Sequence, residues 1–272
     1  MADNIFDGLE KYGVSSVAKK NNDIFANART DSANKKDKSK FNIDEYLHAK
    51  KFVCPVCGQN FTSYVVRDNK VRMNSMDYDL RPIYTPVDPL YYDVVVCATS
   101  CGYSAVREVF AKITRAQTEL ILSEVSPKFR PYTYPKEPSI DLVIERYKLA
   151  LLNAVVKKAK DGEKAYICMK LTWLYRIKGD DLATEKQFAR LTLQGFTNAL
   201  SKEFPPIMGL KQNTVLYLMG AFSVFLGEHD SALKILGEII VSEGSSKRLK
   251  DKARVLRDTV RSEQDGIGVA QV

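Results

Sequence analysis

The sequence predicts an α+β fold that is mostly α, in which a small zinc-ribbon β domain is followed by antiparallel helical hairpins of a tetratricopeptide-like kind. Three observations support this prediction. Cys54 and Cys57 form one close cysteine pair, and Cys97 and Cys101 form another. The residues between the two pairs are rich in strand formers. Beyond Ser139, apolar residues recur at helical spacing in segments that Gly or Pro residues separate.

Five parts are expected along the chain. Residues 1–45 form a largely disordered tail, because they hold too few apolar side chains to offset the entropy of ordering, although the first dozen could form a short docking helix. The zinc-ribbon domain with a following helix takes residues 46–126. A Pro-rich linker at 127–138 cannot be helical and separates this part from a helical domain at 139–264. Residues 265–272 are a flexible C-terminus.

Composition and charge set limits on the class of protein. The 272 residues are 45% hydrophobic and 27% charged, which is typical of a soluble globular chain. Part of the formal net charge of +8 lies at residues 245–261, where seven basic side chains face two acidic ones. Residues 1–13 lack the apolar segment of a signal peptide, and no charge-free apolar run reaches the ~20 residues that span a membrane. We therefore expect a cytoplasmic protein without a membrane partner, in a reducing compartment that keeps metal-ligand cysteines as thiolates.

The residues between the cysteine pairs predict three strands. Residues 61–66 and 70–72 are interpreted as a hairpin, and residues 91–96 as a third strand that leads to the second pair. A helix is expected directly after that pair, capped by Ser104 and ending near Ser126. Strands that carry cysteine turns at their ends make a zinc ribbon.

Six amphipathic helices are expected beyond the linker, joined by short turns that make neighbours antiparallel. The third opens with a capping box formed by Thr184 and Gln187. Single residues mark the other ends: the second helix stops at Gly179, the fourth runs from Asn213 to Gly227, the fifth from Asp230 to Gly244, and the sixth starts at Ser245.

A degenerate tetratricopeptide pattern runs through these helices. Gly220, Gly227 and Ala232 follow the spacing of the repeat, but Ser223 stands where tyrosine is usual. A weaker copy surrounds Gly179, 48 residues before Gly227. The usual period is about 34 residues, so the repeats are degenerate.

Cys54, Cys57, Cys97 and Cys101 are the predicted metal ligands. The alternatives are two disulfides or unrelated core thiols, which the paired spacing and the glycine after each pair disfavour. We expect one structural zinc ion per chain, with iron as the alternative metal for the same all-sulfur cage. Catalytic zinc is not expected, because four thiolates leave no open position for water.

Three further residues with reactive side chains are assigned no chemistry. Cys168 lies in a helix that is apolar nearly all round and is interpreted as a small buried thiol. His48 and His229 lie beside the ends of expected elements, so both are expected to be solvated.

No catalytic residues are predicted. Asp77, Asp79 and Arg81 form a charged cluster, which is interpreted as a solvated hairpin tip and not as an acid-base pair. The sequence holds no phosphate-binding glycine loop, zinc-protease motif or nucleophile elbow. The protein is therefore not expected to be an enzyme.

The chain resembles a bacterial family known only as a domain of unknown function, over roughly residues 46–245. The resemblance rests on residues 54–58, 77–80 with Tyr84, 92–97, 101–103, 173–176 and 217–220. The family more often places two residues between the cysteines of the second pair, whereas three separate Cys97 from Cys101. The longer loop removes no ligand. The resemblance implies a zinc-ribbon head on a tetratricopeptide-like tail, and it implies no reaction.

Three functions are compatible with these features. The preferred hypothesis is a non-enzymatic adaptor whose helical groove binds a protein or peptide segment. The runner-up is a nucleic-acid-binding zinc ribbon, since the ribbon carries bases and aromatic residues, although Asp77 and Asp79 would repel phosphates. These bases and aromatic residues are Tyr64, Arg67, Lys70, Arg72, Tyr84 and Tyr92. A redox protein that uses the metal or the thiols is the third, although no flavin, haem or hydride-cofactor motif occurs.

Overall fold

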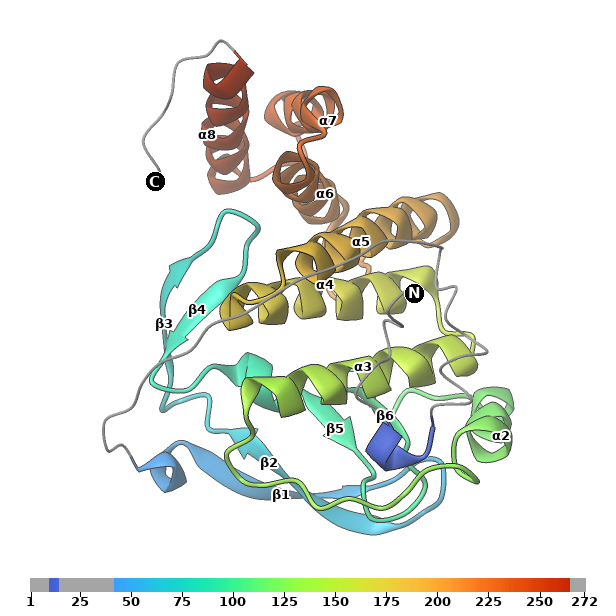
Figure 1. Ribbon diagram of the computed structural model, residues 1–272. Helices are drawn as coiled ribbons and strands as arrows, with labels where there is room; N and C mark the ends of the chain where they lie inside the picture. Colours follow the sequence, from blue (N-terminus) through green and yellow to red (C-terminus); the bar gives the residue numbers. More distant parts are fainter. Residues whose placement is uncertain (1–9, 15–41, 265–272) are drawn as a thin grey trace.

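The fold is α+β and mostly helical, as the sequence predicts (Figure 1). It is given by a computed structural model that describes residues 10–14 and 42–264. Along the described chain, three two-stranded antiparallel pairs come first and the α-helices α2 to α8 follow.

The strands form three antiparallel pairs. These are β1 (Leu47–Val53) with β2 (Asn60–Val66), β3 (Arg72–Met76) with β4 (Pro82–Thr85), and β5 (Val94–Val96) with β6 (Ser104–Val106). The predicted hairpin of residues 61–66 with 70–72 is wrong, because β2 pairs with β1 and β3 pairs with β4. Phe52 of β1 stacks on Phe61 of β2 with ring centroids 5.8 Å apart, a contact between strands that the sequence alone does not reveal.

The strand expected at residues 91–96 is shorter than predicted. Residues Pro89–Tyr92 form a 3-10 turn, η3, and only Val94–Val96 extend as β5. The Asp88 side chain accepts a hydrogen bond from the Leu90 amide at 2.9 Å and so begins the turn.

The helix expected directly after the second cysteine pair begins ten residues later. Ser104 lies in β6 and is buried, so it does not cap a helix. Helix α2 (Arg115–Glu124) begins after Thr114, which forms a capping box with Gln117 at 3.2 and 3.3 Å. The apolar periodicity of residues 106–113 misled the prediction, because those residues pack as a strand end and a turn.

Helices α3 to α8 fill the region predicted to be helical. They are α3 (Ile140–Val156), α4 (Asp161–Lys178), α5 (Leu182–Lys202), α6 (Gln212–Leu226), α7 (His229–Val241) and α8 (Lys247–Gln264). Gly179 and Gly227 end α4 and α6 in the left-handed conformation, as predicted. The capping box predicted at Thr184 is wrong, because the Asp181 carboxylate accepts a hydrogen bond from the Thr184 amide at 2.8 Å.

Helices α4 to α8 pack on one another in sequence order and form a stack (Figure 1). Gly220 of α6 faces α7 closely, since a Cβ atom at this position would lie 3.0 Å from Cδ2 of Leu236. This close approach is consistent with a repeat in which small residues let two helices meet. The tetratricopeptide identity of the stack stays a prediction.

Strands and helices share one hydrophobic core. Helix α3 lies across the β5–β6 pair (Figure 1). The Tyr147 hydroxyl donates to the Leu90 carbonyl at 3.0 Å, and the Asn153 amide donates to Ser104 Oγ at 3.0 Å. Residues 127–138 contain neither helix nor strand, as predicted. The division of the chain into domains at this segment stays a prediction.

Part of the tail expected to be disordered packs into this core. Glu10–Tyr12 form a 3-10 turn, η1, and both Tyr12 and Val14 are buried. The Tyr12 ring stacks on Phe129 at 5.8 Å, and its hydroxyl donates to Glu145 at 3.2 Å. Residues 1–9 and 15–41 of the predicted tail and the predicted flexible C-terminus at 265–272 lie outside the described residues.

Among the described helices, none has the length and apolar character needed to cross a membrane.

Candidate metal centre

The first cysteine pair occupies the turn between β1 and β2. The Cys54 amide donates to the Gln59 carbonyl at 3.0 Å, and the Gly58 amide donates to the Cys54 carbonyl at 2.9 Å. Gly58 has a φ of 73°, a left-handed conformation that glycine adopts without steric cost. The turn therefore folds tightly enough to present Cys54 and Cys57 to one point.

The second pair repeats this arrangement between β5 and β6. The Cys97 amide donates to the Tyr103 carbonyl at 2.8 Å, and the Gly102 amide donates to the Cys97 carbonyl at 3.0 Å. Gly102 has a φ of 71°, and a Cβ atom there would lie 2.3 Å from Phe129 Cγ. Only glycine fits this position. The extra residue between Cys97 and Cys101 is accommodated in the turn and displaces neither sulfur from the cluster.

The four sulfur atoms lie within 4.8 Å of one another, as the sequence predicts for one shared metal. Cys54 Sγ is 3.5 Å from Cys101 Sγ, and Cys57 Sγ is 3.8 Å from Cys97 Sγ. A tetrahedron with metal–sulfur bonds of about 2.3 Å has sulfur–sulfur edges of about 3.8 Å. These distances match that cage, and they are much longer than the ~2.05 Å of a disulfide bond. All four cysteines are free.

The buried thiols of the cluster shift one another's pKa in opposite directions. Hydrogen bonds from the Cys101 and Cys97 thiols lower the pKa of Cys54 to about 2. The hydrogen bond to Cys54, together with burial, raises the pKa of Cys101 well above its ordinary value. A thiolate at Cys54 is therefore favoured over one at Cys101. A divalent cation would supply the positive charge that four adjacent thiolates require.

The surroundings of the cluster close it to solvent on most sides. Cys54, Cys97 and Cys101 are buried, and Cys57 is the exposed member. The Ser100 hydroxyl donates to Cys57 Sγ at 3.5 Å, which is the kind of contact that steadies an outer ligand. With four sulfur ligands, the site would hold a tetrahedral ion without a free coordination position.

Cys168 and the two histidines lie elsewhere. Cys168 is fully buried in α4, as predicted, and burial raises the pKa of its thiol. His48 and His229 are half-buried, and Nδ1 of each is buried without a hydrogen-bond partner. The expectation that both are solvated therefore holds only in part, because each side chain keeps some exposure while its Nδ1 is buried.

The acidic cluster predicted to be a solvated hairpin tip is buried instead. Asp79 follows β3 and has 0% exposure. Its carboxylate accepts hydrogen bonds from Trp173 Nε1 at 2.9 Å and from Arg176 Nη1 at 2.7 Å, both on α4. Burial raises the pKa of Asp79, and the Arg176 charge opposes that shift. The prediction failed because Trp173 and Arg176 are almost a hundred residues away in the sequence.

Further contacts dock the same hairpin on the helices. Arg176 Nε donates to Glu185 at 2.8 Å and Nη2 donates to the Tyr78 hydroxyl at 3.0 Å. The Tyr217 hydroxyl of α6 donates to the Tyr78 carbonyl at 2.7 Å. Asp77 and Arg81 form an ion pair at 3.6 Å. The cluster therefore joins the β3–β4 hairpin to α4, α5 and α6.

The residues proposed for a nucleic-acid track do not gather on one exposed face. Tyr92 is buried and its hydroxyl donates to the Lys136 carbonyl at 3.2 Å. Arg67 Nε donates to the Leu47 carbonyl at 3.1 Å, which holds it at the end of the β1–β2 pair. Lys136 lies over the Tyr64 ring. Lys70, just before β3, and Arg72, the first residue of β3, are both exposed. Tyr84 of β4 pairs with Met73 of β3.

The fold and the site define a protein in which a four-cysteine cluster that could hold a metal ion lies in strand pairs packed against a stack of helices. The chain belongs to the family described as an uncharacterized protein conserved in bacteria, DUF2225, whose profile matches residues 47–260. The match covers both the cysteine cluster and the helices. No curated protein and no solved structure matches the chain.

Proposed function

We propose that the protein is a non-enzymatic adaptor: one structural zinc ion holds the strand pairs together, and the helical stack binds an amphipathic segment of another protein. Zinc is the default ion for four thiolates, with iron as the alternative, and both suit a reducing cytoplasm. A closed four-sulfur site supports a structural role, because no coordination position is left for a substrate or a water molecule.

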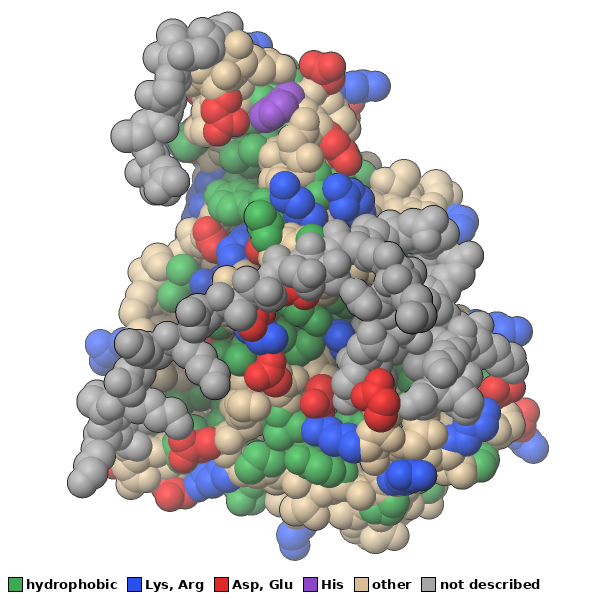
Figure 2. All heavy atoms as spheres, viewed as in Figure 1, with side chains coloured by type: hydrophobic (Ala, Val, Ile, Leu, Met, Phe, Trp, Pro, Cys, Tyr) green, Lys and Arg blue, Asp and Glu red, His purple; other side chains and the backbone are tan. Residues whose placement is uncertain are grey.

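The observation that carries this proposal is a large groove between α6, α8 and the β3–β4 hairpin, with a volume of about 1110 Å³. Its apolar lining comes from all three elements: Met76, Tyr78, Tyr217, Val224, Phe225, Val255 and Leu256. Val255 is 68% exposed, which is unusual for a large apolar side chain. Figure 2 shows hydrophobic side chains between the hairpin tip and α8.

The charges at the rim of the groove indicate the chemistry of the partner. Lys247, Arg248 and Lys252 lie at the rim and form no ion pair with any residue that the structure describes. Two of the three carboxylates at the same rim are already paired, since Asp77 contacts Arg176 at 3.4 Å and Asp251 contacts Arg254 at 2.6 Å. The groove therefore suits a helix with one apolar face and acidic residues along its flank.

A site-specific photocrosslinking experiment tests the adaptor function in the full chain. A photoreactive amino acid replaces Val255 in the groove, and a matched control carries it at Leu182, which is 54% exposed at the start of α5. We expect one protein to crosslink in native cytosol at position 255 and not at 182. A synthetic peptide from the crosslinked segment should be acidic and amphipathic, and Lys252→Glu should weaken its binding about tenfold.

The other outcomes contradict the proposal. A nuclease-sensitive product would favour the nucleic-acid-binding reading. A crosslink from Val255 to residues 265–272 of the same chain, or to a second copy, would assign the groove to the protein itself. Equal crosslinking at both positions would mean that the groove has no selectivity.

A further inference from the structure

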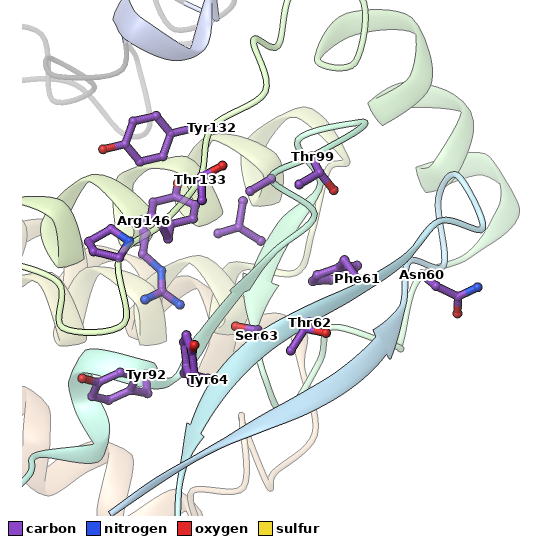
Figure 3. A pocket seen from close by; sticks show the side chains of 14 residues that line it. Asn60, Phe61, Thr62, Ser63, Tyr64, Tyr92, Thr99, Tyr132, Thr133 and Arg146 are labelled. Carbon is purple, nitrogen blue, oxygen red and sulfur yellow. The ribbon is translucent and has the colours of Figure 1, made fainter. Parts of the chain in front are cut away.

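A second cavity, separate from the groove of the proposed adaptor, lies between β2, the extended residues 132–135 and α3 (Figure 3). Its volume is about 300 Å³. The polar side chains that line it include Ser63, Tyr64, Tyr92, Thr133, Tyr134 and Arg146. Arg146 projects from α3 into this space toward Ser63 and Tyr64.

Arg146 is the unusual member of this lining, because it is a cation with only 5% exposure. Its Nη1 donates to the Tyr91 carbonyl at 3.3 Å, and its Nη2 donates to the Val94 carbonyl. Its Nε is buried and has no hydrogen-bond partner. Within the described part of the chain, no carboxylate forms an ion pair with Arg146.

A purely structural role leaves this charge unexplained. The two carbonyls satisfy donors of the guanidinium but do not neutralise it, and a buried charge without a counter-ion is costly. Burial accordingly lowers the pKa of Arg146. The Tyr134 ring lies 5.2 Å from the guanidinium carbon. The guanidinium is therefore a buried charge without a counter-ion among the described residues, and it lines the cavity.

The other cations near the cavity are already neutralised. Lys136 forms an ion pair with Asp44, and Lys11 forms one with Glu145 at 2.5 Å. The cavity is therefore left with one positive charge, which calls for one negative charge. A carboxylate supplies this charge, and its two oxygens match the planar fork of an arginine.

We propose that this cavity binds a small organic carboxylate with a flat body, whose carboxylate group contacts Arg146. The rings of Tyr64, Tyr92 and Tyr134 provide aromatic walls for that body. At the roughly 30 Å³ that one water occupies in the liquid, the cavity has room for about ten non-hydrogen atoms. The ligand would bridge β2, residues 132–135 and α3.

Binding of benzoate to the full-length protein tests this site. Binding is measured by calorimetry and by thermal unfolding with two carboxylates, benzoate and 4-hydroxybenzoate. Benzamide is the uncharged control, and inorganic phosphate is the doubly charged control. We expect both carboxylates to bind with saturation and to raise the unfolding temperature, and benzamide and phosphate to bind at least about tenfold more weakly.

Variants assign that binding to the cavity. Arg146→Gln should weaken benzoate binding by about tenfold or more, and Arg146→Lys should not restore it because the fork is lost. Thr133→Trp fills the exposed rim of the cavity and serves if Arg146→Gln does not fold. Lys250→Gln on α8 is the matched charge control and should bind as the unchanged protein does.

Four results would overturn the site. The first is that neither carboxylate binds with saturation at millimolar concentration. The second and third are that benzamide binds as tightly as benzoate, or that phosphate binds more tightly than benzoate. The fourth is that benzoate binding persists in both Arg146→Gln and Thr133→Trp. Because Val255 and Lys252 lie in the other groove, failure here leaves the crosslinking result unaffected.

Discussion

Arg176 on α4 holds the carboxylate of Asp79, a residue of the β3–β4 hairpin, at 2.7 Å although 97 residues separate them in sequence. Trp173, one turn earlier on α4, donates through Nε1 to the same Asp79 oxygen, Oδ2, at 2.9 Å. The hairpin that forms one wall of the large groove is therefore fixed to the helical stack by a buried ion pair.

Loss of that ion pair should destabilise the protein. Asp79→Ala removes the acceptor that Arg176 and Trp173 Nε1 share, while Arg176 keeps its contact with Glu185, so we expect the free energy of unfolding to fall by about 2 kcal/mol. Trp173 is the single tryptophan, and its fluorescence in a urea titration reports the contact directly. The control is Arg115→Ala, which removes an exposed ion pair and should change stability by less than about 0.5 kcal/mol. An unchanged urea midpoint in Asp79→Ala would show that the pair contributes nothing.

The cysteine cluster should bind one zinc ion per chain. Cys54→Ser and Cys101→Ser remove buried ligands, so we expect metal content to drop and the strand pairs to lose protection from hydrogen exchange. Cys168→Ala is the matched control, because Cys168 is buried outside the cluster and its variant should keep its metal. Elemental analysis of protein purified under reducing conditions makes the measurement. Protein without any metal would contradict the assignment, and iron in place of zinc would correct it.

The cysteine positions were predictable because the relevant geometry is local. Each pair lies in one turn, and the glycine that follows sets the backbone of that turn, so the spacing alone reveals which cysteines come together. The glycines that end α4 and α6 were predictable for the same reason. Ser104 was misread because its role depends on β5, a strand partner that no local pattern specifies.

The contact between α3 and the β5–β6 pair leads to a prediction about fragments. Sequence periodicity favours a helical domain that folds alone from about residue 136. In the structure, Tyr147 and Asn153 of α3 bond to Leu90 and Ser104 of the strand part. We expect a fragment of residues 136–272 to expose this face of α3 and to aggregate.

A fragment of residues 161–272, which omits α3, serves as the comparison. Circular dichroism and size-exclusion chromatography distinguish the outcomes. A monomeric, cooperatively unfolding fragment that starts at residue 136 would establish the two-domain organisation that the sequence predicts.

The basic face of α8 should bind nucleic acid only weakly. Arg254 pairs with Asp251 at 2.6 Å and Arg257 pairs with Asp258 at 2.7 Å, which reduces the charge available to phosphates. Leu256 and Val260 are buried against the stack, as expected for a terminal capping helix. Fluorescence anisotropy with single-stranded RNA should show binding that disappears near physiological salt.

Submicromolar RNA binding at that salt would reverse the order of the functional hypotheses if Arg254→Glu with Arg257→Glu abolished it. Lys11→Gln is the charge control, since Lys11 is paired with Glu145 away from α8.

The sequence by itself determined the two cysteine turns, the mostly helical fold and most helix ends. These features depend on residues a few positions apart, whose spacing and backbone preferences act locally. Only the tertiary structure decided that β1 pairs with β2, that Asp79 is buried, and that Arg146 points into a cavity with no carboxylate partner among the residues described. Each of these depends on contacts between distant segments, and the free energy of a buried charge is set by the groups that surround it in space.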